Sequence, residues 1–199
     1  MANAQAASAT GQRYWTVPIF RAVIALVPAV VITFNANHSA EFGLVAFGSF
    51  ALLSGLVLVV LGPRGLEDRR DRTLFTVQGV VGVVAGALAL TLHAGGLGFF
   101  LYLVSVWGAV TGFLELYSGL RVRGRSASAK DWMLVGAFTA VLALAFLLLP
   151  PHAVVSVGLL GAYLVMLGVY LVIAGLSLKW SAAPDARSAA PAVNDSDTL

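Results

Sequence analysis

Four long stretches without a charged residue constrain the fold of this chain more than any other feature. They cover residues 22–40, 42–63, 73–114 and 132–178. A helix needs about 20 apolar residues to cross a bilayer, so the first two stretches can each form one span and the last two can each form two. Charged residues make up 11% of the sequence and the mean hydropathy is +0.92, whereas soluble proteins carry about one quarter charged residues. The sequence therefore predicts an integral membrane protein.

Turn residues interrupt both of the longest stretches. His93 to Gly96 read HAGG and Pro150 to His152 read PPH, and proline removes a backbone donor and cannot continue a helix. We therefore expect an all-α integral membrane protein with six transmembrane helices. These helices are expected near residues 14–35, 40–62, 73–92, 97–121, 131–149 and 153–179.

The connections between the expected helices differ in their content of Lys and Arg, which are retained on the cytoplasmic side during insertion. The connections that contain PRGLEDRRDR and RVRGRSASAK each hold four of these residues, whereas NANHSAE, HAGG and PPH hold none. We expect three hairpins whose tips face outward, a multi-pass location in the bacterial inner membrane, and both termini in the cytoplasm. Residues 1–13 and 181–199 are then cytoplasmic tails around a transmembrane domain of residues 14–180. The second tail is rich in Ala, Pro, Ser and Asp and is expected to be disordered.

Small and aromatic residues recur at matching positions in three of the expected helices. The helices near 40–62, 97–121 and 153–179 share the order small, any residue, aromatic, four residues, Gly, six residues, Gly, with the register shifting by 57 and then by 56 residues. This recurrence predicts three repeated helical hairpins. Residues seven apart lie almost on one helix face, so the glycines are expected to line grooves for close helix packing. The alternative, that they flank a permeation path, has no polar lining to support it. The six glycines are Gly55, Gly62, Gly112, Gly119, Gly168 and Gly175.

Two charged residues, Arg21 and Glu115, lie inside the expected spans. At a rise of 1.5 Å per residue, both lie about 10 Å inside the cytoplasmic boundary. Intramembrane charges are costly, so they usually face the bundle interior and find a partner. We therefore predict an intramembrane ion pair between them, with the alternative that Arg21 extends to the phosphate headgroups. Gln78, 57 residues after Arg21, is the corresponding intramembrane polar residue of the second repeat.

One histidine lies at each expected outward tip. These are His38, His93 and His152, with Glu41 close to the first. Free imidazole titrates near pH 6.5, so a mildly acid exterior could charge this face and make it responsive to pH. If the tips converged, three nitrogens and a carboxylate could instead bind zinc, although the spacings match no metal-ligand motif. The simplest interpretation is that these loop histidines are solvated, and we expect no metal site.

The sequence carries no motif that favours an enzyme. G-x-S-x-G, H-E-x-x-H and phosphate-cradling loops are missing, and cysteine is absent. We expect no catalytic residue, no cofactor and no nucleic-acid partner. The expected partners are membrane lipids, whose anionic headgroups the Arg-rich cytoplasmic loops could attract, and a homo-oligomer is left open.

The chain resembles the HdeD family of bacterial acid-resistance membrane proteins over about residues 14–180. The resemblance lies in the arginine early in the first helix before a Gly- and Ala-rich hairpin, in GFLELYSGLRVRG (Gly112 to Gly124), and in the LALAFLLLPP turn that enters the last helix. It implies a six-helix inner-membrane protein associated with survival under acid, with no established catalytic residues to carry over. The first hypothesis is therefore a non-enzymatic protein of acid or envelope stress tolerance. The alternatives are a small oligomeric transporter or channel for protons or a small solute, and an accessory membrane subunit.

Overall fold

The computed structural model describes residues 15–65, 68–124 and 129–181. In this part of the chain every regular element is an α-helix, and each of the six helices is long and apolar enough to cross a membrane. The protein is thus an all-α, multi-pass membrane protein, as the uncharged stretches predicted. The helices are α2 (Thr16–Phe34), α3 (Ala40–Gly65), α4 (Arg69–Thr91), α5 (Gly96–Arg121), α6 (Ala129–Leu148) and α7 (Ala153–Ser181).

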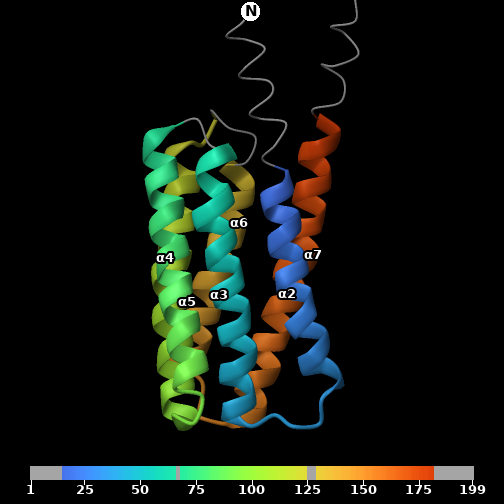
Figure 1. Ribbon diagram of the computed structural model, residues 1–199, viewed down its shortest axis with the longest axis vertical. Helices are drawn as coiled ribbons and strands as arrows, with labels where there is room; N and C mark the ends of the chain where they lie inside the picture. The colour runs from blue at the N-terminus through green and yellow to red at the C-terminus, as the bar shows by residue number, and fades with distance from the viewer. Residues whose placement is uncertain (1–14, 66–67, 125–128, 182–199) are drawn as a thin grey trace, which may run out of the picture.

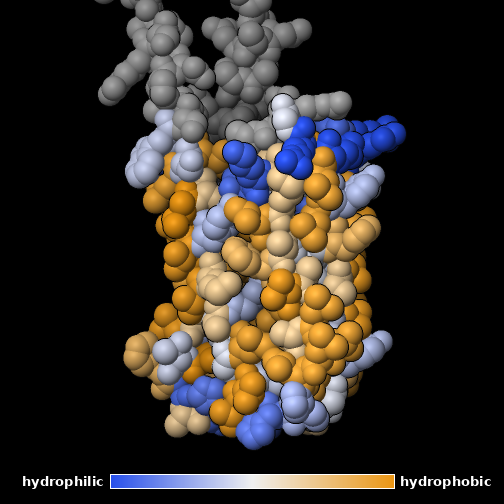
Figure 2. All heavy atoms as spheres, turned by 180° about the vertical axis from the view of Figure 1, so that it is seen from behind, coloured by the Kyte–Doolittle hydropathy of each residue, from blue (hydrophilic) through white to orange (hydrophobic). Residues whose placement is uncertain are grey.

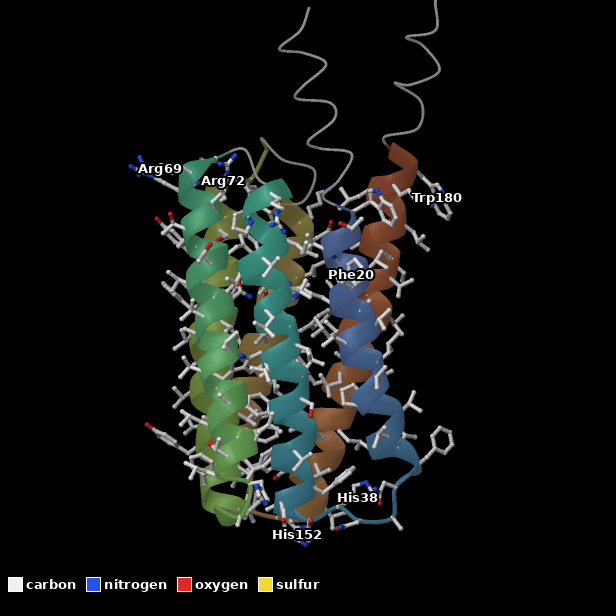
Figure 3. The ribbon with its side chains drawn as sticks, viewed as in Figure 1. Phe20, His38, Arg69, Arg72, His152 and Trp180 are labelled. Carbon is white, nitrogen blue, oxygen red and sulfur yellow. The ribbon has the colours of Figure 1, made fainter. Side chains whose placement is uncertain are left out.

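The six helices stand side by side in one antiparallel bundle (Figure 1). α2 begins and α7 ends at the same end of the bundle. We call this end the arginine end, because Arg69 and Arg72 lie there, and the opposite end, with His38 and His152, the histidine end (Figure 3). Because successive helices run in opposite directions, the helix ends that flank the two Arg-rich connections lie at one end of the bundle and those that flank the three short connections lie at the other (Figure 1).

The sides of the bundle are apolar. Figure 2 shows a broad band of hydrophobic side chains between two ends at which hydrophilic residues gather. Phe20, Phe113 and Leu147, on three different helices, are each more than half exposed. Water would make so much exposed apolar surface an aggregation hazard, whereas lipid hydrocarbon solvates it. The band therefore marks the part of the bundle that lies in the membrane.

The most closely packed helices are not the two arms of one expected hairpin. α3 packs most extensively on α4, α5 on α6, and α7 on α2. The arms α2 and α3, α4 and α5, and α6 and α7 also contact each other, but less extensively. Each close pair therefore joins one hairpin to the next, and α7 returns to α2 to close the bundle. Triplication of a single ancestral hairpin stays a prediction.

Glycines on α3, α5 and α7 allow these close pairs to form. A methyl group on Gly55 would lie 2.6 Å from the carbonyl oxygen of Gly79 on α4, and one on Gly112 would lie 3.0 Å from that of Gly136 on α6. One on Gly168 would lie 2.6 Å from a leucine side chain of α2. At Gly55 and Gly112 only a residue without a side chain permits the backbones to approach this closely, which is how membrane helices gain packing without a hydrophobic driving force.

The second glycines of the three expected pairs differ in how closely the neighbouring helix approaches them. A methyl group on Gly119 would lie 2.8 Å from the backbone nitrogen of Met133, and one on Gly175 would lie 2.6 Å from the side chain of Ile19. At Gly62 the nearest atom is 3.7 Å away, an ordinary van der Waals contact. Gly62 therefore lies on the expected face but is not needed for close approach.

The helix ends differ from expectation mainly at the arginine end. α3 continues through Pro63 to Gly65, and α4 begins at Arg69 rather than at residue 73. The Asp68 side chain caps α4 by accepting from the backbone N–H of Arg70 at 2.8 Å, and this cap lets the helix begin among charged residues. Charged residues thus end the apolar span without ending the helix. Ser181 is still helical, and the rest of the two expected tails lies outside the described residues.

Aromatic side chains fill the core from the middle of the bundle toward the histidine end. Phe47 and Phe50 pack edge-on against Trp107, with ring centroids 5.2 and 5.7 Å apart, and Phe100 packs in the same way against Phe146 at 5.5 Å. All five are buried. The ion pair described next lies between this aromatic layer and the arginine end.

Candidate functional site

Arg21 lies on the buried face of α2, and its guanidinium is directed into the bundle. Nη1 donates to Glu115 Oε1 at 2.9 Å, and Nε donates to Ser54 Oγ on α3 at 3.3 Å. The side chain of Arg21 is 10% exposed and that of Glu115 is 2% exposed. The structure thus brings together the two charges that shared an expected depth, and the guanidinium is held by side chains of the interior instead of extending to headgroups.

Glu115 reaches the centre of the bundle from α5. Its neighbours one turn away on the same helix are Gly112 and Gly119, which bring α5 close to α6. α2 itself packs mainly on α7 and α3. The ion pair therefore spans the middle of the bundle and does not join two helices that already pack closely. A buried carboxylate needs such a partner, because leaving water costs it several kcal/mol.

Gln78, 57 residues after Arg21, is buried on α4. Val135 on α6, a further 57 residues along the chain, is buried too. The interior at this depth is therefore asymmetric in chemistry, with a cation on one helix, an amide on the next and an apolar residue on the third.

A small cavity borders the ion pair on the side of the arginine end. It has a volume of about 30 Å³ and is lined by Arg21, Glu115 and Asp131, together with apolar residues of α2, α6 and α7. A cavity of this size and polarity can hold one or two water molecules. Asp131 accepts a hydrogen bond from the hydroxyl of Tyr170 at 2.7 Å. The arrangement places a second carboxylate near the pair.

Sequence reasoning missed Asp131, which was considered only as the charge that precedes the last apolar stretch. A signal was present. Asp131 lies one helical turn before Val135 on the same face of α6, and Val135 follows Arg21 and Gln78 at equal intervals of 57 residues.

A second ionic cluster, also missed, joins α4 to α5 at the arginine end. Arg121 Nη2 donates to Asp68 Oδ2 at 2.8 Å and also to Asp71 Oδ1. The backbone N–H of Arg70 and the guanidinium of Arg121 hold the pKa of the Asp68 carboxyl below its ordinary value. Arg121 was expected to set topology and to attract anionic headgroups, not to join two helices. The spacing of Asp68 and Asp71, three residues apart on one helix face, was the available signal.

The histidine end shows one contact between its expected pH-responsive residues. His93 Nε2 lies 3.6 Å from Glu41 Oε1, and both side chains are exposed. His38 and His152 lie at the same end (Figure 3). Within the described residues, which include all four of these side chains, no group of three or more is placed to hold a metal ion. The zinc alternative therefore has no geometric support.

Comparison with known proteins adds no relative: no family model, no curated protein and no solved structure matches this chain.

Proposed function

We propose that this protein is a non-enzymatic, multi-pass protein of the bacterial inner membrane that supports tolerance of acid or envelope stress. The observation that best supports a protein without a transport path is the filled centre of the bundle. Between the histidine end and the Arg21–Glu115 pair, the interior is occupied by fully buried side chains such as Phe47, Phe100 and Val104. Such a layer favours a sealed, rigid bundle over an aqueous path through one chain.

The stress role in this proposal comes from the resemblance to the HdeD family. The orientation in the membrane is inferred from the difference between the two ends of the bundle. Arginines gather at one end and the three histidines at the other. By the positive-inside rule the arginine end faces the cytoplasm, and the histidine end then meets the acid exterior. Protonation of His93 there would turn its contact with Glu41 into an ion pair.

Survival of a deletion strain tests the stress role. We expect deletion to lower survival at low external pH, to leave growth at neutral pH unchanged, and to be rescued by the intact gene on a plasmid. Equal survival of the deletion and parent strains in acid, under conditions where the protein is expressed, would rule the role out.

The second candidate is a small transporter or channel for protons or a small solute, and the cavity beside Arg21, Glu115 and Asp131 favours it. Ionisable groups inside membrane helices often mark ion pathways. A proteoliposome assay with a pH-sensitive dye separates the candidates. Proton flux that exceeds empty vesicles and disappears in Glu115→Leu supports transport, whereas flux equal to empty vesicles supports the sealed bundle.

A further inference from the structure

A basic groove lies between the start of α4 and the end of α5, away from the ion pair. Its volume is about 430 Å³, within the range of small-molecule sites. The residues that line it combine three arginines, two hydroxyls and one apolar side chain. They are Arg69, Arg70, Thr73, Leu74, Tyr117 and Arg121.

The positive charge available to a ligand in this groove comes from Arg69 and Arg70. Arg121 is already bound to Asp68 and Asp71. Arg69 and Arg70 are exposed, and among the described residues no carboxylate lies within ion-pair distance of either guanidinium, although the charge of Arg70 also acts on Asp68. Two such guanidinium groups on adjacent residues match an anion with several acceptor oxygens, above all a phosphate.

The hydroxyls of the groove differ in what they can offer. Thr73 donates its proton to the backbone oxygen of Arg69, so its oxygen is left as an acceptor. Tyr117 is 49% exposed, its ring stacks on Phe113, and its hydroxyl forms no hydrogen bond with the described residues. Tyr117 can therefore donate to a phosphate oxygen beside the arginines.

The surface continues from this groove into the membrane as apolar side chains. Leu74 lines the groove, and Val77 on α4 and Phe113 on α5 are exposed about one turn further from the arginine end. A soluble anion would use only the charged part of this surface. An amphiphile would use both parts, with its head between the arginines and its chain along α4 and α5.

We propose that this groove binds the phosphate headgroup of an anionic membrane lipid, with Arg69, Arg70 and Tyr117 as its ligands. Basic pockets between transmembrane helices are typical sites for such headgroups. The site stands apart from the stress role and from the Arg21–Glu115 pair. It holds equally whether or not the bundle transports anything.

Native mass spectrometry of the full chain in detergent tests the site with phosphatidylglycerol, phosphatidylcholine and soluble glycerol phosphate as probes. We expect phosphatidylglycerol to bind most tightly and glycerol phosphate most weakly. Arg69→Gln/Arg70→Gln should weaken phosphatidylglycerol binding by roughly fivefold for each arginine, because each guanidinium in direct contact with the headgroup contributes about that factor. The matched control is Arg64→Gln/Arg123→Gln, which removes the same charge from the same end outside the groove and should lower affinity by about twofold at most in physiological salt.

Three results would overturn the proposal. Equal losses in the two double variants would mean that any arginine at this end attracts lipid. Equal binding of phosphatidylcholine and phosphatidylglycerol would remove the role of the anionic head, and glycerol phosphate that binds as tightly as the lipid would point to a soluble phosphate ligand.

If the groove variant does not fold, Tyr117→Phe keeps the charge and should still weaken phosphatidylglycerol binding by about fivefold, the contribution of one hydrogen bond. An unchanged affinity in Tyr117→Phe would then reject the site.

Discussion

Arg21 and Glu115 form an ion pair across the centre of the bundle, 94 residues apart in sequence and 2.9 Å apart in space. Their helices, α2 and α5, pack mainly on other neighbours. The pair therefore acts as an internal tie between the unit formed by α2 and α7 and the unit formed by α5 and α6. Such a tie specifies which helices face the centre, a role that apolar side chains fill poorly in a membrane, where lipid is as apolar as the core.

A double-mutant cycle measures this tie. Arg21→Met and Glu115→Leu should each lower the free energy of unfolding in detergent by about 3–5 kcal/mol, because each leaves a buried charge without its partner. Water defects can reduce this cost in a bilayer. The double variant should recover most of the loss, since it strands no charge.

The control combines Arg21→Met with Glu41→Gln, a change of carboxylate at the opposite end. These two effects should add, as for distant sites, whereas those of Arg21 and Glu115 should not. Simple additivity in both cycles, measured by thermal melting, would show that the pair contributes no coupling energy.

The number of helices and their approximate positions could be read from the sequence because the bilayer sets a length that an uncharged stretch must meet. The ends of α3 and α4 among charged residues could not. The depth of Arg21 and Glu115 followed from the same geometry. Helix pairing could not be read in this way. Every helix is apolar on most faces, so hydrophobicity does not separate a face toward lipid from one toward the core.

The small residues predicted where helices pack closely, but they did not predict which helix is the neighbour. Gly55 indicated that some helix lies close to α3 but not that this helix is α4, because the contact with Gly79 crosses a charged connection. The ionic cluster of Arg121 could not be predicted from the sequence either. Its arginine and its two aspartates belong to connections that were both interpreted as topology signals, and only the folded bundle brings them together.

Gly55→Ala should destabilise the bundle by about 1–3 kcal/mol, as overpacking does in a filled interior. The new methyl group would lie 2.6 Å from backbone atoms of α4, which cannot rotate away. Gly62→Ala is the matched control on the same helix, because its methyl group meets only an ordinary contact at 3.7 Å. It should be neutral or stabilise the helix by up to about 1 kcal/mol. Similar melting temperatures for both variants would contradict the assigned packing of α3 on α4.

Cysteine labelling checks the orientation. The native chain has no cysteine, so single cysteines report without background. In intact cells an impermeant thiol reagent should label Ala36→Cys, Gly95→Cys and Ala153→Cys at the histidine end. It should not label Gly65→Cys or Ser126→Cys until the membrane is opened. Labelling of the latter pair in intact cells would reverse the proposed topology.

The triple variant His38→Gln/His93→Gln/His152→Gln tests the role of the three histidines at the histidine end. Glutamine keeps polarity and hydrogen bonding but cannot become charged, so the melting temperature at neutral pH should change little. Any contribution of these residues to survival in acid should disappear, because protonation no longer adds charge to this end. A strain with the triple variant that survives acid as well as the parent would separate the histidines from the stress role.

Asp68 gives the arginine end a defined pH dependence. Its pKa in the folded protein is below the ordinary value of 3.8, chiefly because of the Arg70 N–H and then because of Arg121. A carboxyl whose pKa is depressed by folding stabilises the folded state fully above its unfolded pKa. That contribution is lost as the pH falls through the lower, folded pKa. The cluster should therefore hold through mild acidity and weaken only below about pH 3.8.

Asp68→Asn isolates the charge, because asparagine is an equally good helix cap for α4. At neutral pH the variant should melt slightly below the wild type, and the gap should close as the pH falls below 3.8 and the wild-type carboxyl gains its proton. The effect should be small, since Asp68 is half exposed and screened by solvent. In an Arg121→Gln background, Asp68→Asn should lose much of its effect, because the partner cation is gone. A gap that is the same at all pH values, or unchanged without Arg121, would mean that Asp68 acts only as a cap and that the ionic link between α4 and α5 does not contribute to stability.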